Sequence, residues 1–509
     1  MRSRHVAIRA LLALVCALGV SESPAANEPA PPADVRAAQL QDLAQLRRDL
    51  TLDAAYSGEQ RARASQLISE SESRAGTWTP AAFELQVARV VALADNGHST
   101  IWTGPRSGRM NRLPVRLILL ADGVFVVRAT GSGVSALGMR VDAIDGSAVA
   151  DVLARLSIYT GGPPNHRNHD NVSLLESPQL LHAAGIAQSE HQVTLTISNQ
   201  DHARDVVLSA LPPDPTEPVV NRLRYLSTQR LSNESSDRAA LPNRPVPLWL
   251  QDPDRAFRLV PLPGLAAMYI QLKTNTDAED GERIRPFLSL ARQSIAQSRS
   301  QNVILDMRFN GGGDYTKTAA FMSDLPGMIP AAGRVFVITH ASTFSAAITS
   351  IGFVRQSAPG RVTIVGEPNG DRLVFYGEPR PLILPNSGIG MSYATGLHDY
   401  LHGCRWFGPC YWVNWFFPIS VAGLEPDLPA PLSFALIAAG RDPAMEAIVR
   451  ALQRPSSVAK MPVAIPEISA RQLPSETHYA LDQSIKVRAS RPVIGVRDPK
   501  RELPVNSGV

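Results

Sequence analysis

The sequence predicts an α/β fold with a largely parallel sheet, preceded by a helical domain and a β-rich module. From Leu262 onward, strand-like runs alternate with helical segments, as in "AAMYIQL", "NVILDMRF", "RVFVIT" and "VTIVGEP". Strands separated by helices favour parallel pairing. Upstream of these runs, apolar residues recur at helical spacing and are followed by short β-type runs bounded by turn residues.

Size and charge narrow the class of protein. The chain has 509 residues, of which 44% are hydrophobic and 19% are charged. This length exceeds one ordinary core, so we expect several globular domains. The net charge is +4, and about +2 without the predicted leader. A charge this small gives no electrostatic case for a nucleic-acid partner.

Residues 1–26 have the pattern of a secretory signal peptide. A basic start precedes an apolar run from Ala10 to Val20, and small residues follow it. This apolar run is too short to span a bilayer, and no later run reaches 18 apolar residues. We therefore expect export to the periplasm, with no integral membrane segment after the leader is removed.

Three cysteines are present. Cys16 lies in the leader and lacks the small preceding residue typical of lipidation. In an exported protein Cys404 and Cys410 are expected to form a disulfide, although two free thiols are the alternative. A zinc site would need more ligands than these two cysteines and His402 offer, so no metal is expected.

The predicted elements follow in order along the chain. Helical spacing in the first domain ends at "ALADNGHST", where the glycine is expected to stop the helix and His98 lies just beyond it. In the α/β domain, helices are expected near 281–299, near 314–325, from Ser345 and over "RDPAMEAIVRALQ". The whole division is a signal peptide at 1–26, a helical domain at 27–105, a β-rich module at 106–215, a linker at 216–258, an α/β domain at 259–453 and an unassigned tail at 454–509.

A serine at the start of one predicted helix suggests nucleophilic chemistry. Ser345 in "HASTFSAAITS" follows the strand "RVFVIT". Unpaired N–H groups at a helix start stabilise developing negative charge. A helix cap is the alternative, but Ser342 and Thr343 could cap equally well. The run "NGGG", Asn310 to Gly313, could supply a second N–H donor, although glycine runs are more often plain turns.

Several motifs together resemble one enzyme family. "MRVDAIDG", "NVILDMRFNGGGDY", "TFSAAI" and "VTIVGEPNG" are similar, in order and spacing, to segments of the C-terminal processing (tail-specific) serine peptidases, over about residues 80–453. The resemblance implies a crotonase-like (ClpP/crotonase) catalytic domain at 259–453, a PDZ-like module at 106–215 and peptide-bond hydrolysis. It assigns Ser345 as the nucleophile, with Gly312 and Ala346 in the oxyanion hole.

The resemblance also indicates which residue serves as the base. One branch of the family uses a lysine after the nucleophile, but here "GEPNGDRLV" has Asp371 and Arg372 in that place. Arginine stays protonated and cannot act as a base. The other branch, which includes the tricorn core protease and chlamydial-type proteases, uses a histidine in a "DGH"-like turn. His98 in "DNGH" matches it; a solvated helix-end histidine is the alternative.

The third catalytic residue is less clearly indicated. The histidine branch has a glutamate near a "GV.PD" segment, but in "ISVAGLEPDLP" Ser420 stands about where that glutamate is expected. We take Glu425 as the candidate that orients the imidazole. The alternatives left open are Asp427, Asp399 and Glu367.

Two further segments have competing interpretations. "GGPPNHRNHDN" contains two histidines and an aspartate that could suggest a metal, but proline and asparagine favour an exposed loop. The aromatic run "CRWFGPCYWVNWFFP" would either support a loop or form a wall for apolar substrate side chains.

The sequence therefore predicts an exported serine-type endopeptidase that acts on a protein or peptide substrate through a Ser–His acyl-enzyme. It needs no metal or organic cofactor. The alternative is a catalytically silent peptide-binding or scaffold protein of the cell envelope that retains the peptidase fold.

Overall fold

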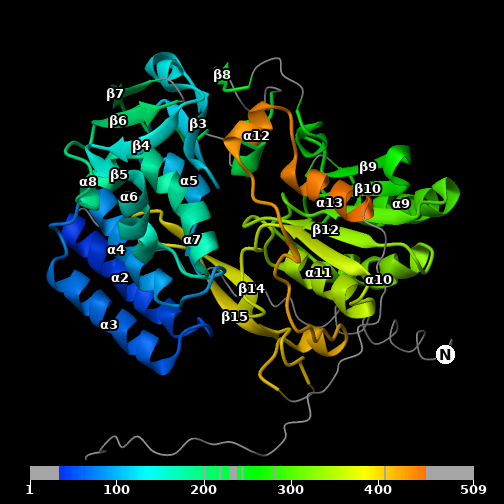
Figure 1. The fold of residues 1–509 in the computed structure, drawn as a ribbon. Helices are drawn as coiled ribbons and strands as arrows, with labels where there is room; N and C mark the ends of the chain where they lie inside the picture. Colours follow the sequence, from blue (N-terminus) through cyan, green and yellow to red (C-terminus); the bar gives the residue numbers. More distant parts are fainter. Residues whose placement is uncertain are drawn as a thin grey trace, which may run out of the picture. The chain divides into compact units, whose positions relative to one another are not determined.

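The computed structural model describes residues 34–453, except 200–201, 217–220, 229–237, 242–245, 280 and 406–407. The predicted leader, with Cys16, and the predicted tail at 454–509 lie outside the described residues. The described part is a mixed α/β fold with three sheets, as the sequence predicts (Figure 1). The predicted domain boundaries and the finer crotonase-like and PDZ-like assignments stay predictions.

A six-stranded sheet forms the α/β domain. Its strands are ordered β16-β13-β12-β11-β10-β9, and only β9 pairs antiparallel. The central strands are buried on both faces, which explains their unbroken apolar sequences. Because β11 and β12 are parallel neighbours, the loops that follow them leave the same edge of the sheet. The strand bounds are β9 Phe257–Leu262, β10 Ala267–Leu272, β11 Asn302–Asp306, β12 Val335–Thr339, β13 Val362–Gly366 and β16 Leu428–Pro429.

Helices cover both faces of this sheet (Figure 1). The first three helices pack with one face of the strands in a single apolar cluster, and the fourth packs with residues of the other face, including Tyr269, Ile304 and Phe336. These helices lie where their apolar spacing predicts them. Their bounds are α9 Ile284–Ser298, α10 Ala319–Asp324, α11 Ala346–Ser357 and α13 Pro443–Gln453.

Three helices form the N-terminal region: α2 (Val35–Leu50), α3 (Gly58–Ser73) and α4 (Pro80–Ala92). Local sequence fixes where they begin: Ser57 and Gln60 form a capping box on α3, and Thr79 caps α4, which has proline in its first turn.

These helices are tied to a hairpin that comes much later in the chain. The hairpin consists of β14 (Val374–Ile383) and β15 (Gly390–Asp399). Met391 belongs to the apolar cluster of the N-terminal helices, and β1 (Thr100–Ile101) pairs antiparallel with β15. The region that carries His98 is therefore held against the segment that follows the predicted nucleophile.

The β-rich module is a five-stranded antiparallel path, β2-β3-β4-β6-β7, with two short strands attached to it. The strands predicted near 193–211 are present as β6 and β7. The bounds are β2 Val115–Leu120, β3 Gly123–Ala129, β4 Arg140–Ile144, β6 Gln192–Ser198 and β7 Ala203–Ser209.

Two segments that the sequence predicts as an exposed loop and a linker contain buried residues. The expected exposed loop "GGPPNHRNHDN" is mostly a helix, α7 (Pro164–Asn171), in which His166 and Asn171 are buried. Its polar composition is typical of a loop, but contacts from other parts of the chain stabilise it as a helix. The predicted linker contains Trp249, which is fully buried and lies under the Arg308 guanidinium.

Candidate active site

Ser345 lies at the junction between β12 and α11. Its backbone has φ 55° and ψ −128°, a conformation that non-glycine residues rarely adopt. A sharp turn of this kind presents a nucleophile at the end of a strand and the start of a helix. Ser345 makes no side-chain capping hydrogen bond to α11, so the capping alternative does not explain it.

The neighbouring hydroxyl groups fix the turn instead. Thr343 Oγ1 donates to the Met307 carbonyl at 2.9 Å and accepts the His340 N–H at 3.0 Å. Ser342 Oγ lies 3.1 Å from His340 Nδ1 and 3.2 Å from His169 Nε2. These residues hold the turn in place and leave Ser345 outside the network.

The glycine loop meets this turn as predicted. A Cβ on Gly312 would lie 2.6 Å from Ser345 Cβ and 3.1 Å from the Ala346 nitrogen, so only glycine allows this approach. Gly312 also has φ +112°. Ala346 is the first residue of α11, and its N–H has no acceptor within the helix.

One predicted oxyanion donor is already engaged. The Gly312 N–H donates to Asn310 Oδ1 at 2.9 Å. Gly312 thus lies against the Ser345 turn, but its N–H does not point to an open site in this structure. The Ala346 N–H is the donor that the helix start supplies directly.

His98 is buried beside the same turn. Its ring centroid lies 4.4 Å from that of Phe344, the residue before Ser345, and it stacks on Phe375 at 5.4 Å. His98 lies beyond the end of α4 as predicted, but only 5% of its surface is exposed, so it is not a solvated helix-end residue. Neither ring nitrogen has a hydrogen-bond partner among the described residues.

The glycine of "DNGH" has another role than the one expected. Helix α4 ends at Ala92, before this glycine, and the residue with a positive φ after the helix is Asp95, at 48°. A Cβ on Gly97 would lie 2.8 Å from the Phe344 ring. Gly97 therefore permits close packing of the His98 turn against the nucleophile turn rather than ending the helix.

Asp371 is the carboxylate that faces His98. Asp371 Oδ2 lies 3.6 Å from His98 Nδ1, and both side chains are buried. Oδ1 accepts the backbone N–H of Arg372 at 2.8 Å, whereas Oδ2 has no hydrogen-bond partner among the described residues. Asp371 and Arg372 occupy the place where the lysine branch of the family has its base. The sequence therefore drew attention to Asp371 but did not predict that it faces His98.

The surroundings of Glu425 do not support its choice as the third residue. Glu425 is exposed to solvent, whereas His98 is buried. The three alternatives are occupied elsewhere: Asp427 binds Arg355 through both oxygens, Asp399 pairs with His402, and Glu367 Oε1 accepts the Leu432 N–H.

The environment favours the neutral form of His98. Burial lowers the pKa of His98 below its ordinary value, and the facing Asp371 carboxylate opposes part of that shift. A neutral imidazole near neutral pH is the form that a general base requires.

Residues that the resemblance did not assign hold the His98 turn in place. Arg372 donates to the Asp95 carbonyl at 2.7 Å and to Asp95 Oδ2 at 2.8 Å. Asn96 exchanges side-chain hydrogen bonds with the backbone of Tyr376, at 2.9 and 3.1 Å. Arg372 thus links the turn that carries His98 to the loop that carries Asp371.

The predicted disulfide between Cys404 and Cys410 is present, with the Cα atoms 5.7 Å apart. Residues of the aromatic run that contains this disulfide fit both interpretations, support of the loop and an exposed apolar surface. Asn414 is buried and its side chain contacts His398 at 3.1 Å, whereas Trp412 and Phe416 are about half exposed. Trp412 and Phe416 thus form a half-exposed aromatic pair.

In the part of the chain that the structure describes, no group of three or more His, Cys, Asp or Glu side chains could hold a metal ion. Within those same residues no helix is long and apolar enough to cross a membrane.

Comparison with known proteins gives matches among solved structures only. No protein-family model and no curated protein matches the chain. The structure of mature CPAF complexed with lactacystin aligns with a TM-score of 0.54 and 14% identity, covering 82% of this chain and 98% of that one. Two others have lower TM-scores: mature CPAF (0.49, 15% identity, 82% and 97% coverage) and a photosystem II C-terminal processing protease (0.32, 14%, 80% and 98%).

These structural neighbours are C-terminal processing proteases, the family that the sequence motifs resemble. At 14% identity, the likeness to CPAF shows a shared fold. The resemblance is thereby confirmed for the fold of the described chain.

Proposed function

We propose that the chain is an exported serine-type endopeptidase with Ser345 as nucleophile, His98 as base and Asp371 as the residue that orients it. The observation that carries the proposal is that buried His98 lies next to both the nucleophile turn and Asp371. Its ring centroid lies 4.4 Å from that of Phe344, and its Nδ1 lies 3.6 Å from Asp371 Oδ2. The shared fold with mature CPAF supports the same activity class.

The reaction proceeds in two halves. Ser345 Oγ attacks the carbonyl carbon of a peptide bond while His98 takes the hydroxyl proton, and the tetrahedral intermediate forms. His98 then gives that proton to the leaving amine, which leaves an ester on Ser345. Water attacks the ester with His98 again as base, so the acid product departs and the serine is restored.

Negative charge on the carbonyl oxygen is stabilised at the start of α11. The Ala346 N–H supplies one donor together with the helix dipole. For Gly312 to supply the second, its N–H must leave Asn310 Oδ1, which is 2.9 Å away in this structure. We assign the release of the Gly312 N–H from Asn310 Oδ1 to substrate binding.

The substrate class is an unfolded protein or peptide. The half-exposed Trp412 and Phe416, whose ring centroids are 6.1 Å apart, offer a surface for apolar side chains beside the disulfide loop. The predicted leader, and a disulfide of the kind that persists in oxidising compartments, support a periplasmic location.

A fluorophosphonate probe, which reacts with activated serines, tests this proposal without knowledge of the substrate. Wild type should be labelled at Ser345, and both Ser345→Ala and His98→Ala should lose labelling. Cleavage of a mixed unfolded-protein substrate should follow the same order. The folded state of each variant is checked by circular dichroism.

The same experiment separates the peptidase from the silent scaffold. Well-folded wild type that neither labels nor cleaves would reject the peptidase and favour a peptide-binding protein. Labelling that persists in His98→Ala would show that the base is another residue.

A further inference from the structure

Five aromatic rings lie in series at the candidate active site. Each ring contacts the next, with centroids 5.0, 4.4, 5.4 and 5.0 Å apart, in the order His166, Phe344, His98, Phe375 and His398. Three of these contacts are nearly parallel, at 10°, 7° and 9°, and the contact between Phe344 and His98 is tilted by 30°. The rings come from α7, the nucleophile turn, the turn after α4, β14 and β15, so segments remote in sequence meet at His98.

Hydrogen bonds do not fix the plane of the His98 ring in this structure. Neither ring nitrogen has a hydrogen-bond partner among the described residues, and Nδ1 lies 3.6 Å from Asp371 Oδ2. The outer torsion of a histidine side chain has a broad energy profile, so the side chain itself does not select one ring plane. The contacts with the Phe344 and Phe375 rings are therefore the restraint to which we assign the orientation of the imidazole.

The Phe375 ring packs against a histidine that is itself held in place. His398 is buried, and its Nδ1 lies 3.1 Å from Asn414 Nδ2. That amide nitrogen also faces the Leu397 carbonyl at 3.4 Å, while the amide oxygen accepts the Tyr315 hydroxyl at 2.9 Å. An amide nitrogen can only donate, so His398 Nδ1 is the acceptor and its ring is anchored to Asn414.

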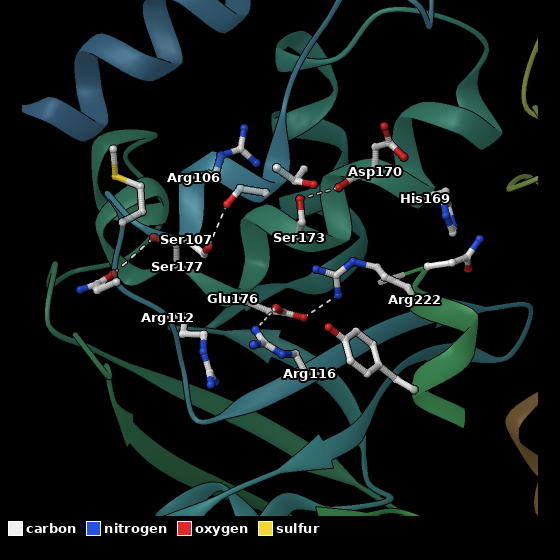
Figure 2. A pocket seen from close by; sticks show the side chains of 16 residues that line it. Arg106, Ser107, Arg112, Arg116, His169, Asp170, Ser173, Glu176, Ser177 and Arg222 are labelled. Carbon is white, nitrogen blue, oxygen red and sulfur yellow. Dashed lines mark hydrogen bonds and ion pairs between the residues drawn. The ribbon is translucent and has the colours of Figure 1, made fainter. Parts of the chain in front are cut away.

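The other end of the series lies in α7. His166 Nε2 is 3.6 Å from Asp170 Oδ2, and Asp170 lines a cavity of about 240 Å³ together with His169 (Figure 2). Phe344 belongs to the nucleophile turn, so a substitution of Phe344 would disturb Ser345 directly. Phe375 and His398 lie outside that turn and are the members of the series that can be replaced without altering it.

We propose that Phe375, backed by His398, orients the His98 imidazole for proton transfer, so that both are positioning residues of the peptidase. The inference rests on the proposed function, because the orientation of His98 matters only if His98 is the base. A parallel stack restricts the tilt of a ring more than a short sliding movement. That freedom is compatible with the movement that would bring Nδ1 into hydrogen-bond range of Asp371, and aromatic faces favour the cation that then forms.

Kinetics of Phe375 variants test the proposal. Phe375→Leu removes the flat face and keeps an apolar side chain, so fluorophosphonate labelling and kcat for cleavage should fall at least about tenfold. KM should stay within about twofold, because the substrate surface is unchanged. Phe375→Tyr keeps the ring and should recover most of the rate. Labelling at the wild-type rate in well-folded Phe375→Leu, or a Phe375→Tyr protein as slow as Phe375→Leu, would overturn the proposal.

Phe353→Leu is the matched control. Phe353 is 3% exposed, compared with 5% for Phe375, and belongs to the same apolar cluster. Its ring contacts among the described residues are with Tyr315 and Phe417. It should lower the urea midpoint about as much as Phe375→Leu and leave labelling within about twofold of wild type. An equal loss of labelling in both leucine variants would show that the loss follows packing in general.

Two variants of His398 separate orientation from stability, and they decide the question should Phe375→Leu not fold. His398→Phe keeps a ring beside Phe375 but leaves the Asn414 amide without its acceptor, so the urea midpoint should fall while labelling stays close to wild type. His398→Leu loses the ring as well, and its labelling should fall severalfold further. Labelling rates that simply follow the urea midpoints would reduce His398 to a structural role.

Nuclear magnetic resonance measures the orientation of His98 without turnover. In Ser345→Ala protein with isotope-labelled histidine, the His98 Cε1–H resonance is identified by its loss when His98→Ala is added. Its relaxation should be that of a fixed ring, and fast ring motion should appear with Phe375→Leu but not with Phe353→Leu. An equally rigid ring in Phe375→Leu would overturn the positioning role. A ring that loosens in Phe375→Leu, in a protein whose wild type is never labelled, would reject the peptidase and leave the restraint on His98 established.

Discussion

His98 Nδ1 and Asp371 Oδ2 face each other at 3.6 Å, with both side chains buried and neither atom in a hydrogen bond. This separation exceeds a hydrogen bond, so a small movement of either side chain would close it. An unsatisfied buried carboxylate oxygen is costly, and the pair gains most from closing when His98 takes a proton. The geometry favours protonation of His98 during the reaction.

Asp371→Asn is expected to lower kcat by about 10²–10⁴-fold, because the amide cannot stabilise the imidazolium or fix the correct tautomer. Glu425→Gln is the matched control and should leave kcat within about twofold, since Glu425 is exposed. Steady-state cleavage measures both. A large loss in Glu425→Gln with normal activity in Asp371→Asn would restore the assignment made from sequence.

The pH profile provides a second readout of the same pair. Burial lowers the pKa of His98 and Asp371 opposes the shift, so removal of the charge at Asp371 should lower that pKa further. The acid limb of kcat/KM in Asp371→Asn is therefore expected at lower pH than in wild type. An acid limb displaced to higher pH would contradict the proposed pairing.

Gly312→Ala should abolish fluorophosphonate labelling. The added Cβ would lie 2.6 Å from Ser345 Cβ, and the backbone has φ +112°, which alanine disfavours. Gly311→Ala is the matched control, because no heavy atom lies within 4 Å of its Cβ position. Labelling of both variants at the wild-type rate would show that the glycine loop does not lie against the nucleophile.

Acid should destabilise the protein through His169 and His340. Burial is the main cause that lowers the pKa of each of these two histidines to about 3. The unfolded chain therefore binds more protons between the ordinary histidine pKa and about 3, so stability is complete above that window and falls as pH drops through it. Each histidine should contribute on the order of 1 kcal/mol per pH unit.

Urea unfolding of Ser345→Ala at pH 7.5, 6 and 5 measures this loss. Adding His169→Asn should make the decline shallower, whereas adding His191→Asn should not, because 79% of the His191 side chain is exposed. Charged or titratable groups near the pair are Arg222, His166, Asp170, Arg308 and Glu367. Identical slopes in both variants would reject the assignment.

Loss of the disulfide should cost about 2 kcal/mol of unfolding free energy, as expected for closing a loop between residues six apart. Urea unfolding of Cys404→Ser with Cys410→Ser measures the loss, and reduced wild type should match it. Full stability after reduction would show that packing alone holds the loop.

Local patterns predicted much of the fold and two of the three catalytic candidates. The strands β10 to β13 have apolar runs that only a sheet covered on both faces buries. Ser345 and His98 lie in short motifs whose positions relative to strand and helix ends are set locally.

Long-range contacts determine the two features that the sequence did not predict, the pairing of Asp371 with His98 and the helix α7. Asp371 faces His98 because Arg372 and Asn96 tie two distant turns together, which no local pattern encodes. The segment that forms α7 has the composition of a loop, yet His166 is buried against Phe344. In both cases packing between remote segments outweighed local preference.

The pairing of β1 with β15 joins two segments that are synthesised at very different times. During synthesis the base emerges early, the nucleophile much later, and the strand that fastens the base turn later still. A nascent or prematurely terminated chain that ends before Gly390 would lack the partner of Thr100 and Ile101, so the turn that carries His98 would lose this support. Under the proposed function, a chain interrupted before this point would therefore be inactive.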